Sequence, residues 1–425
     1  MAISLPKQPT GDQFEEAVAS WVRASGYFTE NRTVFDYDGR EVLELDVVAS
    51  PKSDKFLSRI LVDAKKASAH FGDIFKIYGW RTFLNIPTGC IVHGSALREH
   101  ETAAFQQVCP KVAVHANQFN PGAPVPLGSL PLLNGAALDD LRRAAYAVGW
   151  YQLIADRLVL EDFRTCRKQH PNEQLFARAR EYRRACQLSF FEADPFRRVQ
   201  LLYDAYKNDP GISGECIEWQ ARRSGGDAKK IASDVRDTTE FLWIQHLLSL
   251  ETRARVLIIK NGMEAALQSQ RTDTKMASFW KAVKLAGLPD NFGQGFDLAS
   301  KSPHRTAIPY LLQLYTEVFG GFLVDDTDYL QLASLSGVSN QGVTEALDLL
   351  DVFYPTTNGW HTTSKEVRMM KWIPAYRRGI GAFMRKVSRD LSAYSQVAPT
   401  MGWLLSNWHN SALQILEREL KADEK

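Results

Sequence analysis

The sequence predicts a multidomain α+β protein, with an N-terminal α/β domain (a mixed sheet flanked by helices) and mostly α-helical middle and C-terminal regions. Three observations carry this prediction. Helical and strand-like patterns alternate over about the first 120 residues, which is typical of a sheet with helices on its faces. From about residue 136 onward, nearly every apolar pattern has the helical period. A chain of 425 residues is also longer than one domain usually is.

The composition is that of an ordinary globular protein. Apolar residues make up 45% of the chain, charged residues 24%, and the net charge is only +2, so any surface for nucleic acid has to be local. The five cysteines are scattered without a C-x-x-C pair, which argues against a disulfide framework and a zinc ribbon. Because no signal-peptide core and no run of about 18 apolar residues occurs, we expect a cytoplasmic protein without a membrane partner.

The first predicted helix covers residues 11–28. Phe14, Val18 and Val22 recur in it at helical spacing, and Gly26 is its stop signal.

Two strand signals follow. Residues 42–49 alternate, with apolar side chains on one face and Glu44 and Asp46 on the other. Residues 59–66 form a nearly continuous apolar run that turns polar at its end. The remaining N-terminal elements are predicted as a helix over 71–84, a strand over 88–95, a helix over 97–108 and a strand over 111–116.

The chain as a whole divides into five predicted segments. Proline and glycine interrupt every pattern in the second segment, which is the expected linker. The segments are an N-terminal domain (1–120), a linker (121–135), a helical domain (136–299), a domain with a second motif (300–390) and C-terminal helices (391–425).

The tetrapeptide DAKK occurs twice, in different settings. The second copy follows two glycines, and Asp227 there is a natural helix N-cap. The first copy closes the buried strand, where Asp63 and Lys65, two residues apart, share a face. If this strand pairs with the preceding one, Asp46 joins them on one side of the sheet.

Two carboxylates and a lysine in one place suit metal-dependent chemistry on phosphate. Mg²⁺ (or Mn²⁺) takes a few carboxylates and keeps water ligands, and it can activate a water and stabilise charge on a phosphate. Lys65 could orient that water or neutralise the developing charge. The simpler alternative is an exposed salt bridge between Lys65 and its acidic neighbours.

Several stretches resemble, in order, the motifs of Mrr-like restriction endonucleases of the PD-(D/E)XK nuclease superfamily. The similar stretches are GDQFEEAVASWVRASGYF for the opening helix, ELDVVA for the strand with the metal-binding aspartate, LVDAKK for the D/E-x-K strand, and GCIVHGS and AAFQQV for the next strand and helix. The resemblance covers about residues 8–118 and implies a restriction-endonuclease-like α/β fold there.

The resemblance also implies roles for individual residues. Asp46 and Asp63 match the metal ligands, Lys65 the catalytic lysine, and Glu15 the helix glutamate that supports the metal. Two departures stand out: position 63 carries Asp where relatives more often carry Glu, and no proline precedes Asp46.

Three further residues remain open at this stage. Glu16 is an alternative to Glu15, and Glu44 is a candidate additional ligand. Lys76 is a candidate phosphate contact, with a solvated helix face as the alternative.

A second motif lies in residues 332–347. LASLSGVSNQGVTEAL follows the helix-turn-helix pattern, with Gly337 at the turn and apolar positions forming a small core. A β-hairpin wing is expected around Asn358-Gly359, followed by a basic, aromatic stretch over 365–389. The recognition helix is acidic toward its end, so protein docking and a purely structural role remain alternatives. The candidate nucleic-acid contacts here are Asn340, Gln341, Lys371, Arg377 and Arg378.

Together these features predict a Mg²⁺-dependent endonuclease that hydrolyses phosphodiester bonds of DNA, with a winged-helix-like module that holds the substrate. Restriction or anti-phage defence is the setting that the resemblance suggests. Two alternatives stay open: a non-cleaving DNA-binding or assembly subunit that keeps the fold, and a nuclease that cleaves RNA. Homo-oligomerisation or a partner protein of a defence complex is also open.

Overall fold

In the computed structural model of the protein, the described residues form two compact units. One unit comprises the residues up to Tyr146 together with Phe190–Ala193, and the other comprises Ala147–Ser189 and the residues from Asp194 onward. The described residues are 8–37, 40–52, 59–119, 136–169, 174–206, 218, 221–222, 225–226, 239–269, 273–319, 321–323, 326–354 and 368–369.

Helix α1 (Gly11–Ala24) opens the N-terminal unit. A capping box starts it: Thr10 Oγ1 accepts from the backbone N–H of Gln13 at 3.4 Å, and the Thr10 N–H donates to Gln13 Oε1 at 2.8 Å. The helix stops short of the predicted residue 28 because Gly26 takes a positive φ of 95°. The turn at Gly26 leaves room for a strand that sequence reasoning did not predict.

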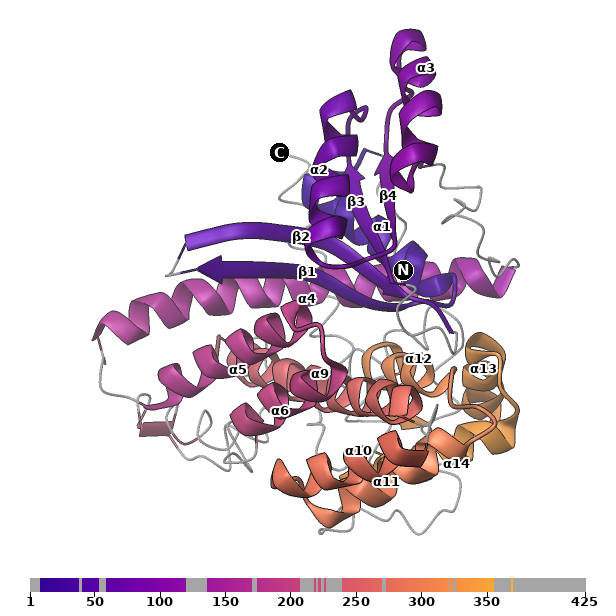
Figure 1. Ribbon diagram of the computed structural model, residues 1–425. Coiled ribbons are helices and arrows are strands. Elements are labelled where there is room, and N and C mark those ends of the chain that lie inside the picture. The colour runs from indigo at the N-terminus through magenta and orange to yellow at the C-terminus, as the bar shows by residue number, and fades with distance from the viewer. Residues whose placement is uncertain are drawn as a thin grey trace. The chain divides into compact units, whose positions relative to one another are not determined.

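The N-terminal unit contains one five-stranded mixed sheet (Figure 1). Its strand order is β1-β2-β3-β4-β5; β1 pairs with β2 and β2 with β3 in antiparallel fashion, whereas β3 pairs with β4 and β4 with β5 in parallel. The strands are β1 (Phe28–Tyr37), β2 (Arg40–Ser50), β3 (Ile60–Lys65), β4 (Thr88–His93) and β5 (Val114–Gln118).

Two corrections to the predicted elements have physical reasons. Strand β1 was missed because it lacks apolar alternation: Thr29, Glu30 and Thr33 are buried polar residues within it. The strand predicted over 111–116 starts only at Val114, because a 3₁₀ turn, η1 (Cys109–Val112), comes first. A proline at the start of that turn lacks the N–H that a strand would need.

Helices cover both faces of the sheet. Apolar side chains of α1, including Val18 and Trp21, pack on one face with residues of β2, β3 and β4. Helices α2 (Phe71–Phe83) and α3 (Glu99–Val108) contribute to the core on the other face. Burying each large side chain stabilises the fold by about 1.5–3 kcal/mol. The predicted mixed sheet with flanking helices is therefore confirmed for this part of the chain.

The second unit is mainly helical. Helix α9 (Thr239–Ser269) carries Gly262 at a close approach to α11 (Asp290–Lys301), since a Cβ there would lie 1.9 Å from a ring carbon of Phe296. The helices from residue 136 onward, before the last pair, are α4 (Ala136–Gln169), α5 (Gln174–Phe191), α6 (Pro195–Tyr206), α9 (Thr239–Ser269), α10 (Asp273–Leu285), α11 (Asp290–Lys301), α12 (Ile308–Gln313) and the π-helical η2 (Leu314–Val318).

Two helices occupy the predicted helix-turn-helix segment: α13 (Asp326–Ser336) and α14 (Asn340–Phe353). Gly337 makes the turn between them with φ 71°, as expected for that position. A two-residue strand β6 (Phe322–Leu323) pairs antiparallel with β7 (Arg368–Met369). The wing predicted around 358–359, the linker and the C-terminal helices lie outside the described residues.

No helix in the described ranges combines the length and the apolar character needed to cross a membrane.

Candidate functional site

The end of strand β3 places Asp63 between two lysines. Lys65 Nζ lies 3.0 Å from Asp63 Oδ2, and Lys76 Nζ, which comes from helix α2, lies 3.6 Å from Asp63 Oδ1. The Asp63 side chain is only 2% exposed, whereas the Lys65 side chain is 28% exposed. The salt bridge considered as an alternative therefore exists, but its carboxylate is buried rather than on the surface.

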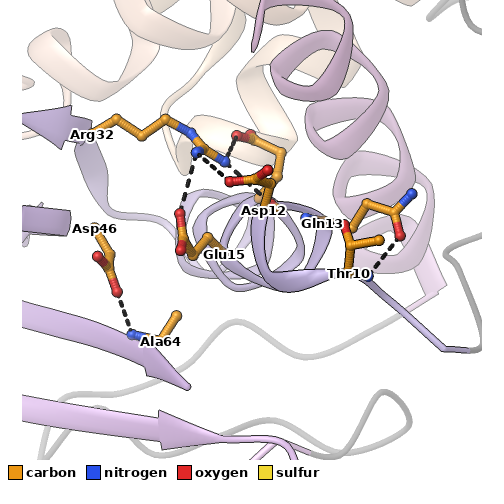
Figure 2. Close-up of polar contacts among 8 residues, drawn as sticks. Thr10, Asp12, Gln13, Glu15, Arg32, Asp46 and Ala64 are labelled. Carbon is orange, nitrogen blue, oxygen red and sulfur yellow. Dashed lines mark hydrogen bonds and ion pairs between the residues drawn. The ribbon is translucent and has the colours of Figure 1, made fainter. Parts of the chain in front are cut away.

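Asp46 reaches the same place from strand β2. The last pairing between β2 and β3 joins Val47 to Val62, so the next position along this register sets Asp46 opposite Asp63. The strand ladder is not continued there; instead Asp46 Oδ2 accepts from the Ala64 N–H at 2.7 Å (Figure 2). A side chain thus replaces a backbone partner where the two strands part.

Glu15 points toward Asp46 from helix α1, and Arg32 of β1 holds it (Figure 2). Arg32 Nη1 lies 3.2 Å from Glu15 Oε2 and 3.6 Å from Asp12 Oδ1, and Nη2 donates to the Asp12 carbonyl oxygen at 3.1 Å. The alternative glutamate, Glu16, also faces this arginine, with 3.8 Å between its Oε2 and Arg32 Nη2. The guanidinium thus ties the first turns of α1 to the sheet.

Burial and crowding of negative charge perturb the acids of this group. Burial, followed by the charge of Asp46, raises the pKa of Glu15 to about 7 although Arg32 opposes the shift. Burial, followed by the charge of Asp63, raises the pKa of Asp46 to about 6 although its hydrogen bond from Ala64 opposes the shift. Burial acts to lower the pKa of Lys65, but the attraction of Asp63 and Asp46 outweighs it and the net shift is upward.

Replacing Glu15 with glutamine should change the stability of the protein in a pH-dependent way. The folded-state pKa of Glu15 lies above its ordinary value of 4.5, so its contribution to stability is full below about pH 4.5 and is lost as pH rises to about 7. Glutamine does not ionise, so the Glu15→Gln variant avoids the loss of stability that ionisation of Glu15 causes. We therefore expect the variant to gain about 1 kcal/mol relative to wild type between pH 4.5 and pH 8, after allowing for solvent screening. Urea denaturation of both proteins without divalent metal, at pH 4.5 and at about pH 8, measures their free energies of unfolding. The same difference between variant and wild type at both pH values would contradict this expectation.

The donor set at Asp46 and Asp63 fits a hard cation. Both oxygens of Asp63 are buried, and no other described residue donates a hydrogen bond to them; the ammonium groups of Lys65 and Lys76 lie 3.0 Å and 3.6 Å away. Oδ1 of Asp46 makes no hydrogen bond to the described part of the chain. No cluster of three or more His, Cys, Asp or Glu metal donors is found among the described residues. Two carboxylates are nevertheless a suitable set for Mg²⁺, which keeps several waters, and a bound ion would compete with Lys65 and Lys76 for Asp63.

Sequence reasoning missed two residues that shape this site. Arg32 has a positive φ of 50°, which is uncommon for a residue with a side chain and marks a local constraint. Gly94 follows β4, and a Cβ there would lie 2.2 Å from the carbonyl oxygen of Lys66. No local sequence pattern predicts that an arginine takes the left-handed backbone conformation. Glycine is needed at position 94 only because β3 and β4 lie side by side in the sheet.

Of the other candidate residues, some lie in the described parts of the chain and some do not. Glu44 is exposed on β2, and its charge is among those that raise the pKa of Glu15. Asn340 and Gln341 are exposed at the start of α14, where Gln341 Nε2 donates to Glu345 Oε1 at 3.1 Å. Helix α14 contains three acids and neither lysine nor arginine, so it offers no cationic side chain to neutralise a phosphate. Lys371, Arg377, Arg378 and Asp227 lie outside the described residues.

Comparison with known proteins adds no relative: no protein-family model, no curated protein and no solved structure matches this chain.

Proposed function

We propose that this protein is a metal-dependent endonuclease that hydrolyses phosphodiester bonds of DNA, with its site at the end of strand β3. One observation carries the proposal: the buried Asp63 carboxylate lies between Lys65 and Lys76, next to the point where the Asp46 side chain accepts a hydrogen bond from the backbone of β3. The order of helix, three strands, helix and strand supports the restriction-endonuclease-like assignment that motif resemblance suggested.

Each residue of the proposed site has a distinct task. Asp46 and Asp63 would hold Mg²⁺ or Mn²⁺, which supplies an activated water and stabilises charge on the phosphate when bound. When the cation displaces Lys65 and Lys76 from Asp63, the two ammonium groups would be free to neutralise phosphate oxygens. Glu15, whose pKa is raised by burial and by the charge of Asp46, lies near that ligand and would support the bound ion.

A second candidate function is favoured by the same contact. If Lys65 stays paired with Asp63, the protein is a non-cleaving subunit that binds DNA or assembles with a partner protein or another copy of itself. A cytoplasmic role in restriction or anti-phage defence belongs to both versions of the proposal.

Cleavage assays separate these functions. The purified full-length protein is incubated with plasmid, linear duplex, single-stranded DNA and RNA, in Mg²⁺, Mn²⁺ or EDTA. The proposal expects metal-dependent cleavage of DNA that EDTA abolishes. Cleavage of RNA alone would support the RNA-cleaving alternative, and intact products on all substrates would support the non-cleaving subunit.

A further inference from the structure

Helix α2 exposes a concentration of aromatic side chains. Nine large apolar side chains are exposed in the described part of the chain, and four of them lie on this one helix. All four are aromatic, whereas the other five are valine or leucine. Exposed apolar residues are normally scattered singly, so a cluster marks a binding surface. The four residues, which we call the α2 aromatic face, are Phe71, Phe75, Tyr78 and Phe83, with exposed fractions of 39%, 50%, 40% and 69%.

Cations accompany the rings of α2. Lys76 Nζ lies 4.1 Å from the centroid of the Trp80 ring, and the guanidinium carbon of Arg81 lies 5.4 Å from the Tyr78 ring. The one acid of the helix, Asp73, accepts a hydrogen bond from the His70 N–H and so caps the helix start. The helix surface therefore combines aromatic rings with positive charge, a composition that suits a polyanion with planar bases.

Two glycines leave the backbone of α2 open between these rings. Gly72 and Gly79 are seven residues apart, which places them on nearly the same side of the helix. A Cβ at either position would meet no atom within 4 Å, so packing inside the described chain does not require glycine there. Glycine weakens a helix, and here it leaves the helix backbone uncovered by side chains at two positions among the aromatic residues.

The α2 surface is also continuous with the candidate site. Lys76 belongs to α2 and contacts both the Trp80 ring and the carboxylate of Asp63, with 3.6 Å between its Nζ and Asp63 Oδ1. A strand whose phosphate lies at Asp63 would thus meet Lys76 first and the rings of the same helix next.

We propose that the α2 aromatic face is a stacking platform for unpaired bases of single-stranded nucleic acid. This inference rests on the proposed nuclease function, because it names the substrate class of that site. Bases of a duplex are stacked on one another and hidden, whereas unpaired bases offer both ring faces to aromatic side chains. The exposed large apolar residues of α2 are all aromatic, and a cation lies beside two aromatic rings of this helix. This composition matches unpaired bases better than it matches an aliphatic protein surface.

The test is a binding measurement that does not depend on cleavage. The full-length protein in EDTA is titrated against a fluorescein-labelled single strand, the matching duplex and an abasic strand with the same number of phosphates. The double variant Phe75→Ala/Tyr78→Ala should bind the single strand about tenfold or more weakly for each ring lost. Its binding to the abasic strand and to the duplex should equal that of wild type.

Two further variants serve as controls. Leu298→Ala removes another exposed apolar side chain, 47% exposed on α11, and should leave all binding unchanged. Phe75→Trp keeps a ring at position 75 and should retain single-strand affinity.

The outcomes separate this inference from the proposed function. Equal single-strand affinity in the double variant and in Leu298→Ala would overturn the inference, as would an equal loss on the abasic strand. A dimer of the wild type that the double variant abolishes, with single-strand binding intact, would show that the face joins two copies and would also overturn it. Ring-dependent binding without any metal-dependent cleavage would refute the nuclease function and retain the platform.

Discussion

Replacing Asp63 with asparagine should abolish divalent-metal binding at the N-terminal site. An asparagine side chain keeps the shape of the aspartate but loses the charge that attracts the cation, and the two nearby lysines then repel it. Loss of a residue that only orients a metal ligand typically weakens metal binding about 10–100-fold. Loss of a ligand itself costs more, so we expect the affinity for Mn²⁺ to fall at least about 100-fold. Isothermal titration of the full-length protein with Mn²⁺ measures this.

Asp63→Glu provides the matched control for the charge. Glutamate keeps the negative carboxylate, so this variant should retain Mn²⁺ binding where Asp63→Asn does not. Wild-type affinity in Asp63→Asn would place any metal elsewhere and contradict the assignment of Asp63.

Replacing Gly94 with alanine should strongly destabilise the N-terminal unit. The added Cβ would lie 2.2 Å from the Lys66 carbonyl oxygen and 3.3 Å from a ring carbon of Phe14. The Gly94 N–H also donates to the Lys65 carbonyl at 2.8 Å, so relieving the clash would pull the end of β3 away. Overpacking of this kind costs about 1–3 kcal/mol or more, and it should displace Lys65.

Gly79→Ala is the control for this prediction. A Cβ at Gly79 would meet nothing within 4 Å, so alanine should stabilise helix α2 by about 0.5–1 kcal/mol. Urea denaturation of both variants compares the two glycines. Equal stabilities would show that Gly94 is not needed for the approach of β3 to β4.

Much of the sheet could be predicted from local patterns. The alternation in β2 predicted apolar side chains on one face and acids on the other; Leu43 and Leu45 are buried and Glu44 is exposed. The apolar run before Asp63 predicted the buried strand β3 with its polar end. These predictions succeed because each depends on one face of one element.

The rest depends on tertiary contacts that no local pattern reveals. Strand β1 is held by pairing with β2 over most of its length, so its polar sequence can be buried without an apolar period. Arg32 acquires its role only when this strand passes the start of α1. Lys76 was a candidate phosphate contact in the sequence, but its pairing with Asp63 follows from the packing of α2 on the sheet.

The most direct measurement compares the two DAKK copies. Metal-dependent DNA cleavage is measured under single-turnover conditions for wild type, Asp63→Asn and Asp227→Asn. The proposed site predicts that Asp63→Asn is slower by about 1000-fold or more, since the metal supplies several kcal/mol, and that Asp227→Asn matches wild type. Equal rates for wild type and Asp63→Asn, or a loss confined to Asp227→Asn, would contradict a nuclease site at the end of β3.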